Sequence, residues 1–220
     1  MKKIGIVVAM NKETLVLERF VHTTELVAGI PFHTFSAGQN TVVLAECGIG
    51  ETRAAAATAL LIAYFQVDEI LNYGYVGALS KNLPLNAVCA VESVVHTDVD
   101  IRAFGLALGQ YDGRDAVAFY PSASLTKAVG VNLPLKRLAS ADKFVSEGEK
   151  KNALRETFGA DICDMEGAGV ASVCDRAGVP YALLKLVSDG VEEDCTEEYM
   201  KNSVRGIIPL VDLICNYLVK

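Results

Sequence analysis

The sequence predicts an α/β protein, a single-domain three-layer α/β/α fold with a mixed, mostly parallel, twisted central sheet over residues 1–220. The expected strands are continuously apolar, which is typical of parallel strands that are buried on both faces of a sheet. They alternate with segments of helical periodicity, so helices are expected to cover both faces. A length of 220 residues fits one domain of this class.

The expected strands are short apolar runs bounded by turn residues or glycines. The first of them, Ile4–Ala9, is ended by the polar segment Asn11–Glu13. The others are, in chain order, Phe32–Phe35, Thr41–Glu46, Glu69–Tyr73, Ala87–His96, Arg137–Ser140, Ile162–Cys163 and Tyr181–Ser188.

The expected helices have 3.6-residue periodicity or capping signals. Arg53–Phe65 has almost no polar face, which is typical of a helix that is buried or packs on a partner chain. Ser146 and Glu149 have capping-box spacing for a helix to about Phe158. Residues 97–132 are interrupted by glycines and are expected to be a long functional loop. Further helices are expected after Glu13 through Leu15, Leu17 and Phe20, at Glu166–Ala177, and from about Thr196 to Val219.

Composition and charge exclude several classes of function. The net charge is −7 and the lysines and arginines do not cluster, which argues against a nucleic-acid partner. No apolar run reaches the roughly 20 residues that span a bilayer, and the apolar start of the chain is too short for a signal peptide. We therefore expect a soluble, cytoplasmic protein without a membrane partner.

The cysteines and histidines do not form a metal site. The six cysteines are widely spread without a C-x-x-C pair, so we expect reduced, mostly buried thiols. His96, Asp98 and Asp100 are the one local candidate for metal ligands, and we interpret them as loop structure. No metal and no cofactor are expected. The cysteines are Cys47, Cys89, Cys163, Cys174, Cys195 and Cys215.

Three acids, Glu13, Glu166 and Asp189, each follow an expected strand. Ligands of open α/β sheets lie at the carboxyl ends of the strands, so these acids are candidates for a site. Carboxylates without a metal or cofactor motif suit cleavage of a glycosidic bond, in which one acid protonates the leaving group and another positions water. The carboxylate of Glu166 has two acceptor oxygens, which suits the two hydroxyls of a ribose diol.

Each candidate also has a structural interpretation. Glu13 and Glu166 could be first-turn acids that the helix dipole favours, and Asp189 could cap a turn before Gly190. Phe144, an aromatic residue after a strand, could equally be part of the core. We prefer the functional interpretation of the acids because all three follow strands.

Five short motifs occur along the chain at strand ends and glycine turns. They are Ile4-Gly5-Ile6 with Ala9-Met10 and Glu13, Gly48-Ile49-Gly50, Asp100–Gly105 with Gly109-Gln110, Asp164-Met165-Glu166 and Val187-Ser188-Asp189. Together these motifs resemble the purine nucleoside phosphorylase/uridine phosphorylase superfamily, and its 5′-methylthioadenosine/S-adenosylhomocysteine nucleosidase branch in particular. The resemblance covers nearly the whole chain and implies a nucleoside phosphorylase-like fold.

The resemblance implies a role for each acid. Asp189 would be the general acid at purine N7, so that the base leaves as a neutral molecule. Glu13 would help to activate the attacking water. Glu166 would hold the ribose diol, with Met165 packed on the sugar, and Asp164 would cap or support Glu166.

The resemblance also implies substrate-binding residues around the acids. Phe144 would stack on the base, the backbone around Val145 would read the edge of the base, and Ile49 would line the pocket for the 5′ substituent. Further substrate-binding candidates are Tyr75, Lys185 and Ser188.

The chain departs from the branch at positions near the nucleophile. Gly74–Ala78 has Tyr75 and Val76 where the branch usually has G-S-A-G-G, and Lys185 stands where it has an arginine. Lysine is a point charge and not a planar fork, so the second change is not neutral. Val8 replaces a glycine common near the end of the first strand, and Arg53 is an additional cation near the glycine loop.

The first functional hypothesis is a hydrolytic nucleosidase that releases adenine from 5′-methylthioadenosine or S-adenosylhomocysteine. A phosphorylase of the same fold, a futalosine-type nucleosidase and a nucleoside-binding protein without turnover are the alternatives. The apolar helix Arg53–Phe65 also predicts a homodimer, since such a face would promote association if it were exposed on a monomer.

Overall fold

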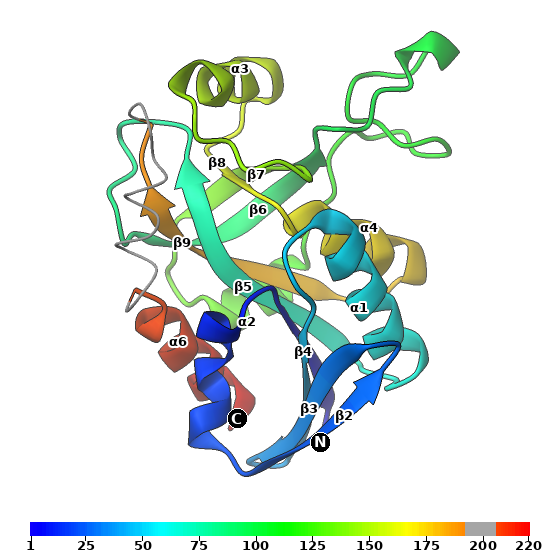
Figure 1. Cartoon of the computed structure of the whole chain (residues 1–220), viewed down its shortest axis with the longest axis vertical. Helices are drawn as coiled ribbons and strands as arrows, with labels where there is room; N and C mark the ends of the chain where they lie inside the picture. Colours follow the sequence, from blue (N-terminus) through cyan, green and yellow to red (C-terminus); the bar gives the residue numbers. More distant parts are fainter. Residues whose placement is uncertain (192–205) are drawn as a thin grey trace.

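One mixed sheet with helices on both faces forms the part of the chain that the computed structural model describes, residues 1–191 and 206–220 (Figure 1). The predicted α/β fold class is therefore confirmed. The strands are β1 (Lys3–Val8), β2 (His22–Val27), β3 (Ile30–Ala37), β4 (Asn40–Glu46), β5 (Glu69–Ala78), β6 (Val88–His96), β7 (Leu135–Ser140), β8 (Ile162–Asp164) and β9 (Tyr181–Asp189).

The sheet has the strand order β2-β3-β4-β1-β5-β8-β7-β6-β9, and β9 also pairs with β5. Strands β5 to β9 therefore close into a ring. Strand β1 is parallel to both β4 and β5, and β5 is parallel to β9, so the carboxyl ends of these four strands point the same way. The antiparallel pairs are β2–β3, β3–β4, β5–β8 and β6–β9.

Strand β1 is apolar throughout because it has a core on each face. The side chains of Ile4, Ile6 and Val8 belong to one buried cluster, and that of Val7 belongs to the other. This alternation follows the two-residue period of a strand. Helices α1 (Glu51–Ala63) and α4 (Gly167–Ala177) cover the Val7 side, and η1 (Asn11–Arg19), α2 (Ala123–Val129) and α6 (Ile208–Leu218) cover the other (Figure 1).

The structure differs from the sequence expectations at two places. The strand β2 was not predicted, because five of its six residues are exposed and its sequence HTTELV has no apolar face. The helix expected after Glu13 is confirmed, as the 3-10 helix η1. Residues 97–132 contain helix α2 and the short η2 (Arg102–Phe104), although they were expected to be a loop.

Helix ends differ from the capping signals in two places. Helix α3 (Gly148–Phe158) has Glu147 as its N-cap, without a side-chain capping bond, so the predicted capping box of Ser146 is wrong. The predicted C-terminal helix corresponds to α6, and its first part, residues 196–205, lies outside the described residues.

Strand β5 is longer than expected and reaches Ala78. The segment Gly74–Ala78 is therefore not a loop after the strand, and Tyr75 is a strand residue with 7% of its surface exposed. In the described part of the chain, no helix has both the length and the hydrophobicity that crossing a membrane requires.

Candidate functional site

Residues at or beyond the carboxyl ends of six strands surround a cavity of about 310 Å³. All three predicted acids line it: Glu13 after β1, Glu166 after β8 and Asp189 at the end of β9. The cavity therefore brings together side chains that are up to 176 positions apart in sequence (Glu13 to Asp189). Five other predicted site residues also line it, namely Ile49, Tyr75, Phe144, Met165 and Ser188.

The carboxylate of Glu13 is held at the end of β1 by backbone groups. Its Oε2 atom accepts the N–H of Ala9 at 2.8 Å and that of Met10 at 3.0 Å. The side chain is 2% exposed. Burial raises the pKa of this carboxyl above 4.5, although the two backbone donors and the nearby cations Lys185 and Lys12 act in the opposite direction. The result is a fixed carboxyl group of increased basicity at the cavity wall.

Gly74 in β5 leaves space for Glu13. A Cβ atom built at this glycine would lie 2.8 Å from Oε1 of Glu13, which is closer than real Cβ contacts allow. The missing side chain thus permits the second oxygen of Glu13 to approach the backbone of β5.

Glu166 is the N-cap residue of α4 and joins two helix N-termini. Its Oε1 atom accepts the N–H of Gly50, the N-cap residue of α1, at 3.0 Å. Gly50 has φ of +119°, a conformation that favours glycine. Burial and the negative charge of Asp164 raise the pKa of Glu166 to about 8, although Lys185 and Gly50 oppose the shift.

The raised pKa of Glu166 predicts how the stability of the ligand-free protein depends on pH. The folded state binds the proton more tightly than the unfolded state, whose pKa is near 4.5. The stabilising contribution is therefore complete below pH 4.5 and is lost as the pH rises through 8. We expect that Glu166→Gln removes this contribution, so that the melting temperature falls less steeply between pH 5 and 8 than in the wild type.

Thermal melts of the wild type and Glu166→Gln across this pH range measure the difference in slope. The matched control is Glu156→Gln, because Glu156 lies on the exposed face of α3. If Glu166→Gln keeps the wild-type slope of melting temperature against pH, as the control should, the raised pKa of Glu166 is not the cause of that slope.

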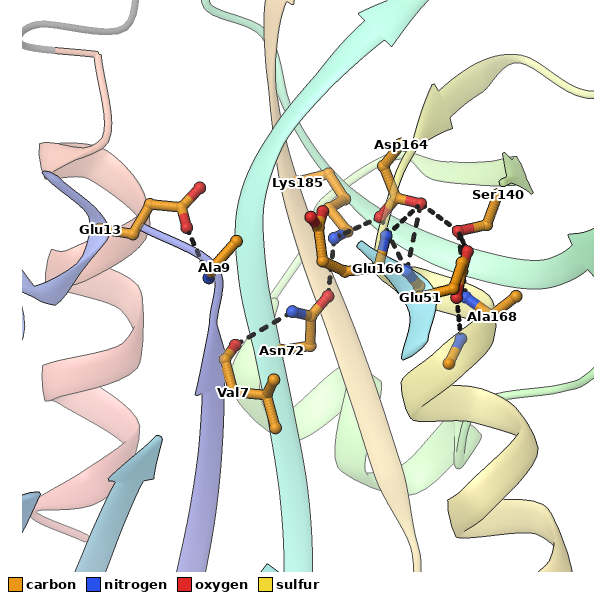
Figure 2. Close-up of polar contacts among 12 residues, drawn as sticks. Val7, Ala9, Glu13, Glu51, Asn72, Ser140, Asp164, Glu166, Ala168 and Lys185 are labelled. Carbon is orange, nitrogen blue, oxygen red and sulfur yellow. Dashed lines mark hydrogen bonds and ion pairs between the residues drawn. The ribbon is translucent and has the colours of Figure 1, made fainter. Parts of the chain in front are cut away.

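A buried ion pair joins Lys185 to Asp164, and Asp164 also lines the cavity (Figure 2). The Nζ atom of Lys185 lies 2.7 Å from Oδ2 of Asp164, and both side chains are 1% exposed. Lys185 also donates to Oδ1 of Asn72 at 2.6 Å, and Asn72 donates to the carbonyl of Val7 at 3.0 Å. Burial alone would lower the pKa of Lys185, but the charges of Asp164, Glu166 and Glu13 raise it above 10.5. Lys185 therefore carries a full positive charge in the interior.

Asp164 supports Glu166, as predicted. Its carboxylate accepts the N–H of Gly167 at 3.1 Å and lies 3.4 Å from the N–H of Glu166. It therefore caps the first turn of α4 from the end of β8. Substituting this acid would disturb both the helix start and the ion pair with Lys185.

The hydroxyl of Ser140 connects Asp164 to a second acid, Glu51, by hydrogen bonds (Figure 2). This hydroxyl bonds to the carboxyls of both Asp164 and Glu51, and its oxygen accepts the N–H of Ala168 at 3.0 Å. A hydroxyl has one proton and can donate to only one acid, so the other acid carries a proton. Burial and the charge of Asp164 raise the pKa of Glu51 to about 7, which assigns the proton to Glu51.

Asp189 is held by donors at both oxygens. Its Oδ1 atom accepts the hydroxyl proton of Ser188 at 2.7 Å, and its Oδ2 atom lies 2.6 Å from Nζ of Lys151. The side chains of Lys151 and Asp189 are 0% and 3% exposed. Asp189 is therefore a rigidly placed carboxylate.

Two predicted site residues do not line the cavity. The side chain of Val145 packs against a small core cluster that includes Leu79 and Cys163. Lys185 lies beneath the cavity wall and points toward Asp164 and Asn72.

The cavity has further lining residues to which the sequence assigned no role: Met10, Val76, Gly77 and Cys163. These residues lie next to Glu13, Tyr75, Asp164 and Asp189 at the same strand ends. This proximity is the feature of the sequence that could have indicated them as lining residues. Lys151 had no such signal, since it comes from a helix that is otherwise exposed.

The loop residues considered for a metal have other partners. His96 bonds to the hydroxyl of Tyr111 at 2.6 Å, Asp98 pairs with Lys143 at 2.7 Å, and Asp100 pairs with Arg102. Residues 1–191 and 206–220 contain no group of three or more His, Cys, Asp or Glu side chains that could hold a metal ion.

Comparison with known proteins identifies relatives along the whole chain. The family model described as the phosphorylase superfamily matches residues 3–215. A curated 5′-methylthioadenosine/S-adenosylhomocysteine nucleosidase of Shewanella denitrificans is 33% identical over 208 residues, which cover 90% of each protein.

Solved structures match equally completely. A Helicobacter pylori 5′-methylthioadenosine/S-adenosylhomocysteine nucleosidase with butyl-thio-DADMe-Immucillin-A has a TM-score of 0.92 and 30% identity, over 99% of this chain and 97% of that one. The native futalosine hydrolase of Helicobacter pylori has a TM-score of 0.93 and 29% identity, over 99% and 97% of the two chains.

Proposed function

The chain belongs to the phosphorylase superfamily, and we propose that it is a nucleosidase that hydrolyses the N-glycosidic bond of 5′-methylthioadenosine or S-adenosylhomocysteine and releases adenine. The observation that carries the proposal is the convergence of Glu13, Glu166 and Asp189 on one cavity. Roles in purine and methionine salvage belong to the same proposal.

The reaction passes through a ribosyl oxocarbenium ion, which the three acids stabilise from different sides. Asp189 gives N7 of the purine a proton, so that the base leaves as a neutral molecule. Glu166 accepts hydrogen bonds from the ribose hydroxyls. Glu13, whose pKa burial raises, accepts a proton from the attacking water.

The remaining lining residues bind the nucleoside. Phe144 and Ile49 are 47% and 49% exposed, which suits residues at the mouth that close on the base and on the 5′ substituent. Met165 packs on the sugar, Tyr75 and Ser188 line the walls, and the backbone at Val145 contacts the base edge.

Water and not phosphate is the nucleophile in this proposal. Among the described residues that line the cavity, none is a lysine or an arginine, whereas a phosphate needs several cations. Lys185 is engaged with Asp164 and Asn72. The guanidinium of Arg53 lies against Gly48, where an added Cβ would be 2.6 Å from it.

A substrate panel tests the proposal. Purified protein is incubated with 5′-methylthioadenosine, S-adenosylhomocysteine and futalosine, with and without phosphate, and the free base and the sugar product are measured. We expect adenine and a free thiosugar at a rate that phosphate does not change. Strict dependence on phosphate with a sugar 1-phosphate product would favour a phosphorylase. Preference for futalosine would favour a futalosine-type nucleosidase, and absence of base release would favour a nucleoside-binding protein.

Gly74→Ala is expected to lower kcat by about 10²-fold, because small displacements of a catalytic group have effects of this size. The added Cβ would lie 2.8 Å from Oε1 of Glu13 and displace the carboxylate. The control is Gly178→Ala, a substitution at a helix end with φ of +68° and open space, which strains the backbone far from the cavity. The kcat values of both variants are measured from the steady-state release of adenine. Equal kcat values for the two variants would contradict the placement of Glu13.

We also propose a homodimer formed through α1 and α4. The exposed side of α1 carries Ala59, Ile62 and Ala63, and it lines a hollow of about 730 Å³ with residues of α4 and of the 111–114 loop. The helix predicted to be apolar all round thus has one face in the core and an apolar face outside. Light scattering tests this, and a stable monomer would contradict it.

A cytoplasmic location completes the proposal. The five cysteines among the described residues are free and buried, which supports a reducing compartment. Cys195 lies outside the described residues.

A further inference from the structure

Lys151 is a buried lysine on an otherwise exposed helix. Helix α3 has the sequence GEKKNALRETF, and Lys151 is the one residue of it that is buried, with 0% exposure. Lysines are almost never fully buried unless they are paired. The adjacent Lys150, in contrast, has a side chain that is 65% exposed. The position of Lys151 therefore needs a specific explanation.

The ammonium group of Lys151 lies directly against the proposed general acid. Its Nζ atom is 2.6 Å from Oδ2 of Asp189, and it also donates to the carbonyl of Gly190. Gly77 of β5 leaves space for the pair, because an added Cβ would lie 3.1 Å from Nζ and 2.9 Å from Oδ2. Asp189 and Gly77 line the cavity, so Lys151 approaches Asp189 from behind the cavity wall.

This arrangement raises a problem for acid catalysis by Asp189. The ammonium group of Lys151 lies 2.6 Å from one oxygen of Asp189, and a positive charge at this distance favours the ionised form of a carboxyl group. An ionised carboxylate has no proton to give to N7. The proton must therefore reach Asp189 during the reaction, and the ammonium group of Lys151, whose Nζ atom lies 2.6 Å from Oδ2, is in place to supply it.

We propose that Lys151 is the positioning residue that supplies Asp189 with the proton for the departing base. The inference rests on the proposed nucleosidase function. An Nζ–H bond of Lys151 breaks as an O–H bond forms on Asp189. That O–H bond then breaks as N7–H forms, while the electrons of the glycosidic bond move into the purine. Lys151 is left neutral and Asp189 is ionised again.

The proton balance closes with the attack of water. Water adds to the oxocarbenium ion and loses a proton to Glu13, which releases it to solvent. Lys151 takes one proton back from solvent, so the net reaction consumes one water and no proton. Lysine suits this cycle because burial shifts its proton affinity readily, whereas arginine does not release its proton in proteins.

Two substitutions of Lys151 test the proposal in the full-length protein. Lys151→Arg keeps a positive charge beside Asp189 but removes the transferable proton. Lys151→Met removes both. We expect each variant to lower kcat for adenine release from 5′-methylthioadenosine by about 10²-fold or more, the usual contribution of a positioned proton donor, while KM stays unchanged. The matched control Lys150→Met should keep the wild-type kcat.

A double-mutant cycle separates this role from a structural one. If Lys151 acts through Asp189, then Lys151→Met causes no further loss of kcat in an Asp189→Asn background. If the double variant loses the product of the two single losses in kcat, the substitutions act independently and the proposal is overturned. Full activity of a folded Lys151→Arg protein would also overturn it. Circular dichroism and thermal melts identify variants that fail to fold, and Lys151→Arg, which keeps the ion pair, decides the question if Lys151→Met does not fold.

The same measurements distinguish failure of the inference from failure of the proposed function. If Asp189→Asn abolishes base release and both Lys151 variants keep it, only the role of Lys151 is wrong. If Asp189→Asn keeps the wild-type rate, or if the wild type releases no base, the proposed function is itself wrong and the inference falls with it.

Discussion

Asp189→Asn is expected to lower kcat for adenine release by about 10²- to 10⁴-fold, the range typical for loss of a general acid. The amide has the shape of the carboxyl group and can still bond to Ser188 and Lys151, but it cannot carry the proton to N7. Because the nucleoside contacts of Glu166 and Phe144 remain, KM should change little. Steady-state release of adenine from 5′-methylthioadenosine measures both constants.

The control for this variant is Asp212→Asn. Asp212 lies on α6, where its side chain is 51% exposed and pairs with Arg19. It should keep the wild-type kcat. A folded Asp189→Asn protein with unchanged kcat would show that another group protonates the base.

Lys185→Met is expected to destabilise the fold by about 3–5 kcal/mol, because it leaves the buried charge of Asp164 without its partner. Both side chains of this pair are 1% exposed. For a protein of this size the melting temperature should fall by roughly 6–20 °C. Differential scanning calorimetry measures the change.

The matched control is Lys143→Met, which breaks an ion pair of similar length at the surface. Nζ of Lys143 lies 2.7 Å from Asp98, with side-chain exposures of 71% and 29%. Surface pairs contribute about 0–1 kcal/mol, so the melting temperature should hardly change. Equal effects of the two substitutions would contradict a structural role for the pair of Lys185 and Asp164.

The sheet strands were predictable where burial on both faces made the sequence continuously apolar. Strands β1 and β9 are examples, since every residue of β9 is buried. Strand β2 was not predictable, because it is an exposed strand without an apolar face, and among the described strands it pairs with β3 alone. Its partner β3 carried the apolar signal for the hairpin.

The acids of the cavity were predictable for a related reason. Each follows a strand whose end the hydrophobic pattern located. Strands β1 and β9 are parallel to β5, so their carboxyl ends bring Glu13 and Asp189 to one edge, whereas β8 brings Glu166 to the cavity through antiparallel pairing with β5 at Gly77 and Ala78. Asp164 could be assigned a supporting role from its position beside Glu166. The resemblance of the short motifs to a known family added the roles of these residues.

The residues behind the cavity wall could not be predicted. Lys151 and Glu51 stand in helical sequence where charged residues are normally exposed, and only the packing of α3 and α1 reveals that they are buried. Lys185 was predicted to contact the ligand because it stands where the resembled branch has an arginine, but its side chain points toward Asp164 and Asn72. Sequence separation conceals such pairs, since Lys151 and Asp189 are 38 positions apart.

If Glu13, Glu166 and Asp189 surround one sugar-to-purine bond, a crystal structure of the protein with a nucleoside analogue that cannot be cleaved will show this arrangement. We expect ribose hydroxyls within hydrogen-bonding distance of Glu166, the N7 edge of the base at Asp189, and a water or its equivalent between Glu13 and the anomeric carbon. A ligand bound in the opposite orientation, or outside this cavity, would contradict this expectation.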